Sequence, residues 1–280
     1  MDVSTRAPGT EARSAVPDLR KFADGIRLRA VRMVAPHGFG YLGQALSSAE
    51  EFAALFATAR PGVDHLVCSP GHYIIAVFAA AGELGLLDEA ALAAYGDNGS
   101  PLEAIGTERS PAVDYTCGSL GQGLSAAAGF TLADRMRGSD ARTFAVVSDG
   151  EMEEGQVWEA AMFAAHHKLA ALTVLLDANN SQVDGPVDTI TTIEPIAAKW
   201  ESFGWHAVDI DGHDVAAITA ALEAAEAEKA RPSVVICRTS TRQGLDILPP
   251  DADGHFIKLP PKLAAAAVAE LTARLEGTNA

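Results

Sequence analysis

Short runs of Val, Leu and Phe alternate along the chain with longer segments in which apolar residues recur at helical spacing. Apolar runs are typical of strands covered on both faces, and helical spacing is typical of the covering helices. The pattern predicts strands at residues 65–67, 143–147, 172–176, 205–208 and 234–237. It predicts helices at residues 71–85, 121–136, 155–169, 193–202 and 213–230. This alternation indicates an α/β fold with a doubly wound, mostly parallel sheet and helices on both faces.

Further helices are predicted outside this alternation. Residues 20–34 carry basic and apolar side chains at helical spacing, and residues 47–51 combine serine hydroxyls with two glutamates, as the start of a helix does. We expect both to be surface helices. Residues 261–274 are Ala-rich and predict a terminal helix. The expected organisation is a flexible segment at 1–18, one domain at 19–262, and a C-terminal helix and tail at 263–280.

Charge and cysteine content narrow the classes of partner. The 280 residues carry a formal net charge of −16, which argues against a nucleic-acid or anionic-membrane partner because like charges repel. No apolar stretch approaches the roughly 20 residues that cross a bilayer, and residues 1–13 lack the apolar core of an export signal. The three cysteines, Cys68, Cys117 and Cys237, are odd in number and far apart in the sequence, which fits reduced thiols better than a set of disulfides. We expect a cytoplasmic protein.

Two polar positions follow predicted strands at the same edge of the sheet. Asp149 ends the run that begins at residue 143, and Asn179 lies 30 positions later, after the next strand. Each offers a hard oxygen suited to Mg²⁺, and the backbone carbonyl of Ser181 could add a third. Gly150 leaves room for a phosphate, towards which a helix starting near Gly155 would point its N–H groups. The pattern predicts a site for a metal ion and a diphosphate.

Each half of this pattern also has an ordinary interpretation. Asp-Gly and Asp-Ala-Asn-Asn are both common turn sequences. Either one alone is more often a turn than a ligand site. Their occurrence together, each after a strand, favours the metal–diphosphate site.

Residues 148–151 and 179–180 resemble the thiamine diphosphate signature, an Asp-Gly followed about thirty residues later by Asn. The segment 154–169 resembles the transketolase version of it. Ser-Pro-Gly-His at 69–72 and Cys-Gly-Ser-Leu-Gly-Gln-Gly at 117–123 are similar to two further transketolase segments. Phe-Gly-Trp at 203–205 and Asp-Gly-His-Asp at 211–214 also have counterparts there. The resemblance covers roughly residues 20–260 and makes this the thiamine diphosphate-binding domain.

The resemblance to the transketolase family also implies roles for individual residues. It places Asp149, Asn179 and the carbonyl of Ser181 on Mg²⁺. It places Gly150 and Glu154 beside the diphosphate or at a subunit contact. The residues implied to touch the aminopyrimidine end of thiamine diphosphate are Gly118, Ser119 and Leu120.

Three of the eight histidines are implied to be catalytic. His72 matches the histidine near the thiazolium and diphosphate, and His255 a late histidine over the diphosphate and the reacting carbons. His37, six residues before Gly43, matches the register of the family's first histidine. Imidazole suits proton transfer to and from a substrate hydroxyl. The other histidines are expected to pack or to be exposed: His65, His166, His167, His206 and His213.

The implied activity is transfer of a two-carbon unit from a ketose donor to an aldehyde acceptor by a transferase that uses thiamine diphosphate and Mg²⁺. A complete transketolase chain is more than twice as long as this one. The resemblance therefore implies a second subunit carrying the pyrimidine-binding and C-terminal domains, in an α₂β₂ heterotetramer.

Two segments depart from the family and bear on the substrate. Thr107 stands where the family has a histidine, and Glu108 adds a negative charge unfavourable to a sugar phosphate. Phe39 and Tyr41 make the entry segment apolar. These departures predict a substrate other than pentose phosphates.

Two other functions remain open from the sequence. One is the thiamine diphosphate-binding α subunit of a 2-oxo acid decarboxylase or dehydrogenase. The other is a non-catalytic scaffold with the same fold, which would have no chemical need for the retained aspartate, asparagine and histidines.

Overall fold

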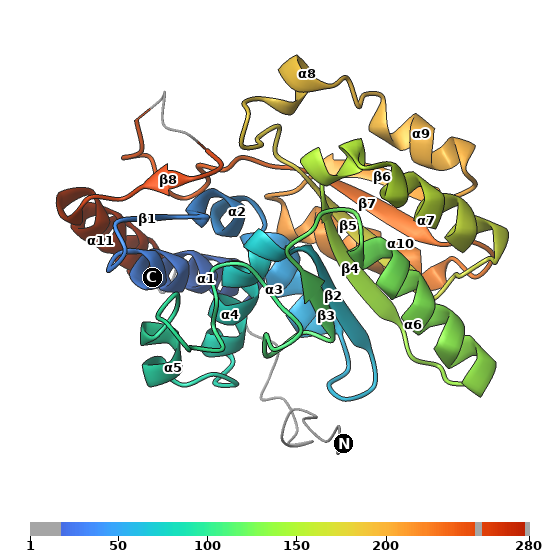
Figure 1. Cartoon of the computed structure of the whole chain (residues 1–280), viewed down its shortest axis with the longest axis horizontal. Helices are drawn as coiled ribbons and strands as arrows, with labels where there is room; N and C mark the ends of the chain where they lie inside the picture. Colours follow the sequence, from blue (N-terminus) through green and yellow to red (C-terminus); the bar gives the residue numbers. More distant parts are fainter. Residues whose placement is uncertain (1–17, 250–253, 278–280) are drawn as a thin grey trace.

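The computed structural model describes residues 18–249 and 254–277. Its main sheet has six strands in the order β3-β2-β4-β5-β7-β6, all parallel (Figure 1). The strands are β2 (His65–Pro70), β3 (Tyr115–Cys117), β4 (Thr143–Ser148), β5 (Leu172–Ala178), β6 (His206–Asp211) and β7 (Ser233–Arg238). The five predicted strands are all present, and β3 was not predicted.

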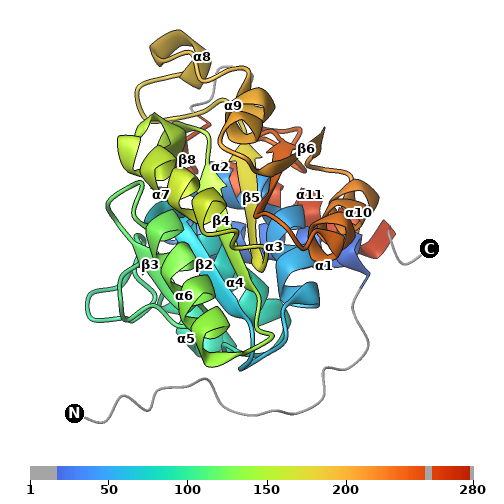
Figure 2. The ribbon, with the colours of Figure 1, turned by 90° about the vertical axis from the view of Figure 1, so that its right-hand side faces the viewer.

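Helices cover both faces of this sheet, as predicted. Phe144 and Val146 of β4 face one apolar core, whereas Ala145 and Val147 face the other. The first core is closed by α3 (Ala49–Thr58), α4 (Ile74–Glu83) and α10 (Val215–Ala227). The second is closed by α6 (Gly123–Arg137), α7 (Gly155–His166) and α9 (Ile196–Ser202). Figure 2 shows α6 and α7 on the side of the sheet away from α10.

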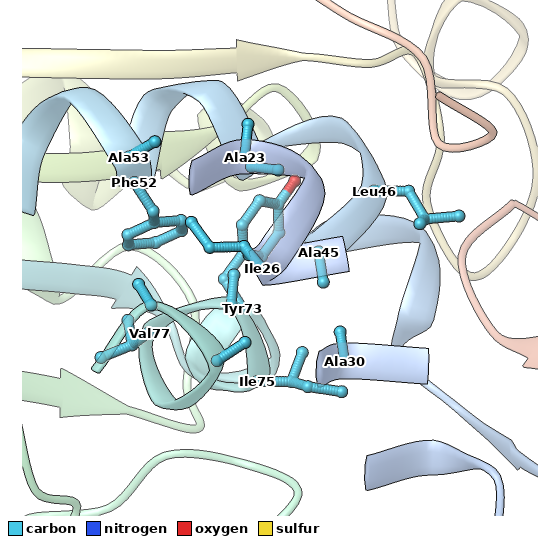
Figure 3. Close-up of a cluster of buried hydrophobic side chains, with 14 of the residues drawn as sticks. Ala23, Ile26, Ala30, Ala45, Leu46, Phe52, Ala53, Tyr73, Ile75 and Val77 are labelled. Atoms are coloured by element: carbon cyan, nitrogen blue, oxygen red, sulfur yellow. The ribbon is translucent and has the colours of Figure 1, made fainter. Parts of the chain in front are cut away.

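The expectation that the helices predicted at residues 20–34 and from residues 47–51 lie at the surface is wrong. Helix α1 (Leu19–Val34) packs on α3, α4 and the terminal helix α11 (Pro261–Gly277), and the first eight residues of α3 are buried. Figure 3 shows this layer, where Ile26 of α1 lies against Phe52 of α3 and Tyr73. The charge pattern was misleading because Arg27, only 2% exposed, forms a buried ion pair with Glu50. The serine hydroxyl expected to cap α3, that of Ser48, donates instead to the Gln44 carbonyl.

Short elements between the predicted ones carry much of the site. They are β1 (Phe39–Gly40), α2 (Leu42–Ser47), η1 (Gly71–Tyr73), α5 (Glu89–Ala93), η2 (Gly150–Glu153), α8 (Val187–Ile190) and β8 (Ile257–Lys258). Strands β1 and β8 pair antiparallel and so join the two ends of the domain. Residues 1–17, nearly all of the expected flexible segment, lie outside the described residues. So do residues 278–280, the end of the expected C-terminal helix and tail. Within residues 18–249 and 254–277, no helix has the length and apolar character to cross a bilayer.

The chain order reverses between β2 and β4. From β2 the chain proceeds to its neighbour β3 on one side, and from β4 it proceeds to β5 on the other side. The loops that leave the carboxyl ends of β2 and β4 therefore diverge, and ligands of open α/β sheets bind in the crevice between such loops. Ser69 to His72 follow or end β2, and Asp149 follows β4.

Candidate active site at the carboxyl ends of the strands

Asp149 and Asn179 meet at adjacent strand ends, because Ser148 of β4 is in register with Asp177 of β5. Asp149 is 3% exposed; one carboxylate oxygen accepts the Gly150 N–H at 2.8 Å and the other accepts the Asn180 N–H at 2.5 Å. Asn180 has φ 55°, a left-handed conformation that Asn tolerates. The sequence thus folds into two tight turns that hold both side chains at one point.

Asn179 is oriented from both ends. Its Oδ1 accepts the Ser181 N–H at 2.9 Å, and its Nδ2 donates to Oδ2 of Asp177 at 2.7 Å. These bonds leave Ser181 beside Asn179, as the implied metal set requires. The turn 179–181 is therefore fixed by its own hydrogen bonds.

Asp177 is a buried hub that was not singled out in the sequence. Its side chain accepts hydroxyl hydrogen bonds from Ser47 at 2.6 Å and Tyr73 at 2.7 Å, and a further one from Thr239. These donors come from α2, η1 and the segment after β7. The one sequence signal was its position directly before Ala-Asn-Asn at the end of a strand. Asp177 therefore links the turn 179–181 to α2, to η1 and to the segment after β7.

Asp177, Asp149 and Glu51 form a cluster of three buried carboxyl groups. Burial and the neighbouring Asp177 raise the pKa of Asp149 to about 7. Burial also raises the pKa of Asp177, and burial together with Asp177 holds the pKa of Glu51 well above its ordinary value. Neither carboxyl oxygen of Glu51 has a hydrogen-bond partner within the described residues. Such a cluster is an unfavourable place for negative charge and a favourable one for a cation.

The loop 117–123, after β3, forms the opposite wall. Gly118 and Ser119 are exposed and Leu120 is half-buried, so all three are open to a ligand. A Cβ built on Gly118 would lie 3.1 Å from Ile105, which places residues 105–107 beside the loop. Glu154 is exposed and lies against Gly121 of the same loop. Glu154 therefore lies beside the loop that carries Gly118, Ser119 and Leu120.

His72 and His255 form a pair, with ring centroids 5.0 Å apart. Burial and the nearby His255 lower the pKa of His72 to about 3, so this imidazole is neutral at physiological pH. The amide nitrogen of Gln44, on α2, lies 2.9 Å from Nδ1 of His255. The ring of Tyr41 lies 5.2 Å from that of His72 and 5.6 Å from that of His255, centroid to centroid. Neither Tyr41 nor Gln44 was predicted as a site residue.

His37, which was predicted to be catalytic, does not lie with this pair of histidines. Its Nε2 lies 2.6 Å from the Tyr95 carbonyl oxygen, and its ring packs edge-on against the Tyr95 ring. The bend at 35–38 turns His37 away, and Tyr41 at the start of α2 occupies the place beside the two histidines. Counting residues back from Gly43 could not reveal this bend.

An aromatic wall leads from the histidine pair to the surface. Phe256 packs on Tyr41 at 5.1 Å and on Phe39 at 5.4 Å, and Phe39 is 53% exposed. Together with Lys258 and Pro260, Phe39 and Phe256 line a surface hollow at the paired strands β1 and β8. The surface beside Tyr41 and the histidine pair is therefore largely apolar.

The remaining histidines have structural surroundings. His65 stacks on Phe130 at 4.6 Å, and His206 lies 3.3 Å from the Ser233 hydroxyl. His213 contacts Glu50 at 3.2 Å and accepts the Ser240 N–H. His166 and His167 contact each other at the end of α7. The described residues contain no group of three or more His, Cys, Asp or Glu side chains arranged for a metal.

Comparison with known proteins agrees with this fold. Residues 19–255 match the family described as "Transketolase, thiamine diphosphate binding domain". The chain belongs to the transketolase family, whose members are transferases, and it carries the family's cofactor-binding domain.

Two relatives are separate subunits of about this length. The chain is 36% identical to the 6-deoxy-6-sulfo-D-fructose transketolase subunit SqwG of Clostridium sp. (strain MSTE9), over 91% of this chain and 96% of the relative. It is 27% identical to an apulose-4-phosphate transketolase subunit of Phocaeicola vulgatus, over 89% and 92%.

Longer relatives match only in part. Human transketolase is 30% identical over 92% of this chain but only 42% of its own length. The crystal structure of Campylobacter jejuni transketolase superposes with a TM-score of 0.82 at 25% identity, covering 91% of this chain and 42% of that one. The chain thus spans less than half the length of these one-chain transketolases.

Proposed function

We propose that the chain is the cofactor-binding subunit of a transketolase-like enzyme that transfers a two-carbon unit from a ketose to an aldehyde, using thiamine diphosphate and Mg²⁺. The observation that carries the proposal is the meeting of Asp149 and Asn179 at the carboxyl ends of β4 and β5, next to the reversal of strand order. The loop 117–123 and the segment that carries His72 lie beside these turns, because Glu151 bonds to Gly121 and to Ser69, and Asn179 bonds to Tyr73. Family membership supplies the reaction class.

The residues at this crevice fit Mg²⁺ and a diphosphate. Asp149, Asn179 and the Ser181 carbonyl would hold the metal, whose charge would offset the buried carboxyl groups around Asp177. A Cβ on Gly150 would meet Gln182 at an ordinary 3.4 Å, so packing within the chain does not require glycine there. A closely approaching phosphate would. The N-terminus of α7 adds N–H groups on the same side.

Thiamine diphosphate, when bound, supplies the electron sink needed to break a carbon–carbon bond beside a ketone. The protein's own residues then position the substrate and move protons. Neutral His72 can donate a hydrogen bond to a substrate oxygen or accept one from a substrate hydroxyl, and His255, held by Gln44, is the second imidazole available to the same substrate. Tyr41 closes the space beside both rings and excludes water from them.

A second subunit should complete this site. The two relatives of similar length are named as subunits of transketolases, and the one-chain family members contain more than twice the sequence matched here. We expect the partner to carry the pyrimidine-binding and C-terminal domains and the assembly to be α₂β₂. Cys68 and Cys237, which are buried free thiols, are compatible with a reducing cytoplasm.

The substrate is expected to differ from the pentose phosphates. Thr107 lies in the loop next to Gly71, where the Gly106 N–H donates to the Gly71 carbonyl, so its hydroxyl replaces an imidazole close to the crevice. The aromatic wall offers few hydrogen bonds to a polyhydroxylated chain. A ketose with fewer hydroxyl groups and no phosphate at its distal end would suit this entry better.

The test is product analysis with the two subunits reconstituted in thiamine diphosphate and Mg²⁺. Ketoses should give a shortened aldose and an extended ketose with an added aldehyde, and the chain without its partner should give no turnover. Rapid formation of sedoheptulose 7-phosphate from xylulose 5-phosphate and ribose 5-phosphate would contradict the substrate proposal. Decarboxylation of a 2-oxo acid in place of ketol transfer would contradict the reaction itself.

A further inference from the structure

Glu151 is a buried carboxyl group beside the candidate site and has no role in the function described so far. It is 0% exposed, and it lies two residues after Asp149 in η2. Its Oε1 accepts two hydrogen bonds, from the Ser69 hydroxyl at 2.6 Å and from the Gly121 N–H at 2.7 Å. Its own N–H donates to the Ser148 hydroxyl at 3.2 Å.

These partners belong to three neighbouring strands. Ser69 is in β2 and leads into His72, Gly121 lies in the loop after β3, and Ser148 ends β4. The sheet order places β3, β2 and β4 side by side. The carboxyl group of Glu151 therefore joins the segment that leads into His72 to the loop 117–123, while its backbone N–H contacts the end of β4.

Besides its hydrogen bond to Glu151, the loop 117–123 is held by a hydrogen bond from the Cys117 thiol to the Ser119 carbonyl and by Glu154, which lies against Gly121. Contacts across it are made by glycines: a Cβ on Gly71 would lie 2.3 Å from the Cys117 carbonyl oxygen, and one on Gly123 would lie 2.3 Å from the Ser69 hydroxyl. Gly121 itself has φ +85°, a conformation that side chains disfavour. The hydrogen bond from the Gly121 N–H to Glu151 is directional and therefore fixes the position of this part of the loop.

We propose that Glu151 is a positioning residue, which holds the loop 117–123 against Ser69 so that the loop is preformed for the cofactor. It acts through the loop and touches neither cofactor nor substrate. The role in cofactor binding rests on the proposed function, but the hydrogen bonds of Glu151 to Ser69 and Gly121 are present without any ligand. Preformed loops bind more tightly because less ordering is left to occur on binding.

The first measurement is hydrogen exchange of the full chain without cofactor, comparing wild type with Glu151→Ala and Glu151→Gln. In Glu151→Ala, amides at 118–122 should exchange about tenfold faster, the effect of losing hydrogen bonds to a carboxyl group. Glu151→Gln retains an acceptor oxygen at the same place and should stay within about twofold of wild type. Glu201→Gln, an exposed change on α9, is the matched control and should have no effect on this loop.

The second measurement is the dissociation constant of thiamine diphosphate for the reconstituted pair at saturating Mg²⁺. It should rise about tenfold in Glu151→Ala and be rescued in Glu151→Gln. If Glu151→Ala does not fold, Ser69→Ala removes one donor alone and should give about a threefold effect in both measurements.

Three results overturn the proposal: wild-type loop exchange in Glu151→Ala, equal defects in Glu151→Ala and Glu151→Gln, or no effect of Ser69→Ala where the alanine variant at 151 is unfolded. Failure of the wild-type pair to bind thiamine diphosphate would instead refute the proposed function. The exchange data would still decide whether Glu151 holds the loop.

Discussion

Gln44 holds its side-chain amide 2.9 Å from Nδ1 of His255, although 211 residues separate them in the sequence. Gln44 is 1% exposed and lies on α2, whose six residues are all buried. The same short helix sends Ser47 to Asp177 and presents the Leu46 carbonyl to Arg27. Helix α2 therefore connects the histidine pair, the metal side and the helical layer behind them.

Replacing Gln44 by Leu should lower kcat about tenfold, since His255 loses the contact that orients its ring and small misplacements of a reacting group are costly. Affinity for thiamine diphosphate should change little, because the metal-side turns are untouched. Steady-state kinetics and cofactor titration of the reconstituted pair measure both. Gln243→Leu, on the segment after β7, is the control. Equal activity of the two variants would show that Gln44 does not position His255.

Replacing Tyr41 should impair catalysis, whereas replacing His37 should mainly lower stability. Tyr41→Ala opens the space beside His72 and His255 and should lower kcat/KM at least about tenfold, by admitting water and loosening both rings. His37→Ala removes a hydrogen bond to the Tyr95 carbonyl and should cost about 1 kcal/mol of stability with kcat nearly unchanged. Kinetics and thermal unfolding of both variants separate the roles. A larger loss of kcat in His37→Ala than in Tyr41→Ala would restore His37 as the reacting histidine.

Arg27 should be important for stability. Its guanidinium is buried, pairs with Glu50 at 2.5 Å and donates to the Leu46 carbonyl. Arg27→Met leaves the Glu50 carboxylate buried without its main partner and should cost about 3–5 kcal/mol of unfolding free energy. The control is Arg32→Met on the same helix, where the side chain is exposed, and its cost should be at most about 1 kcal/mol. Similar losses in denaturant unfolding would argue against this assignment.

The metal-free protein should show a pH-dependent penalty from Asp149. Its pKa is about 7 in the fold against an ordinary 3.8, so between these values the folded state binds more protons than the unfolded chain. Unfolding free energy therefore falls as pH rises through this window. His72 contributes in the opposite direction below its ordinary pKa of 6.5, because its folded pKa is about 3. A variant comparison isolates the aspartate.

The comparison is Asp149→Asn against wild type in chelator, by denaturant unfolding at pH 5 and pH 8. The difference in stability should shift in favour of the variant by about 2–3 kcal/mol between the two pH values. The exposed Asp184→Asn controls for the loss of one charge. A difference that is the same at both pH values would mean that Asp149 is not held protonated by burial.

The sequence predicted those features that depend on local composition. Continuous apolar runs identified β4, β5 and β7 because central strands of a parallel sheet are buried on both faces. Strand β3 and helix α2 were missed because three and six residues are too few for a period to show. Their positions follow from tertiary packing.

The site could be predicted where a motif and a strand end coincide, as at Asp149 and Asn179. It could not be predicted where residues far apart in sequence meet. Glu50 makes Arg27 a core residue, which its basic neighbours concealed, and the bend before β1 exchanges His37 for Tyr41 beside His255. Asp177 and Glu151 gave little signal because a carboxyl group two residues from a predicted ligand resembles any surface acid until its burial is known.

The most direct test of the account is calorimetry of thiamine diphosphate binding to the reconstituted pair, with and without Mg²⁺, for wild type, Asp149→Ala and Asp184→Ala. We predict Mg²⁺-dependent binding by wild type and by Asp184→Ala, and binding at least about a hundredfold weaker for Asp149→Ala, which loses a metal ligand. Binding that is independent of Mg²⁺, or equally tight in Asp149→Ala, would contradict the assignment of this strand-end crevice as the cofactor site.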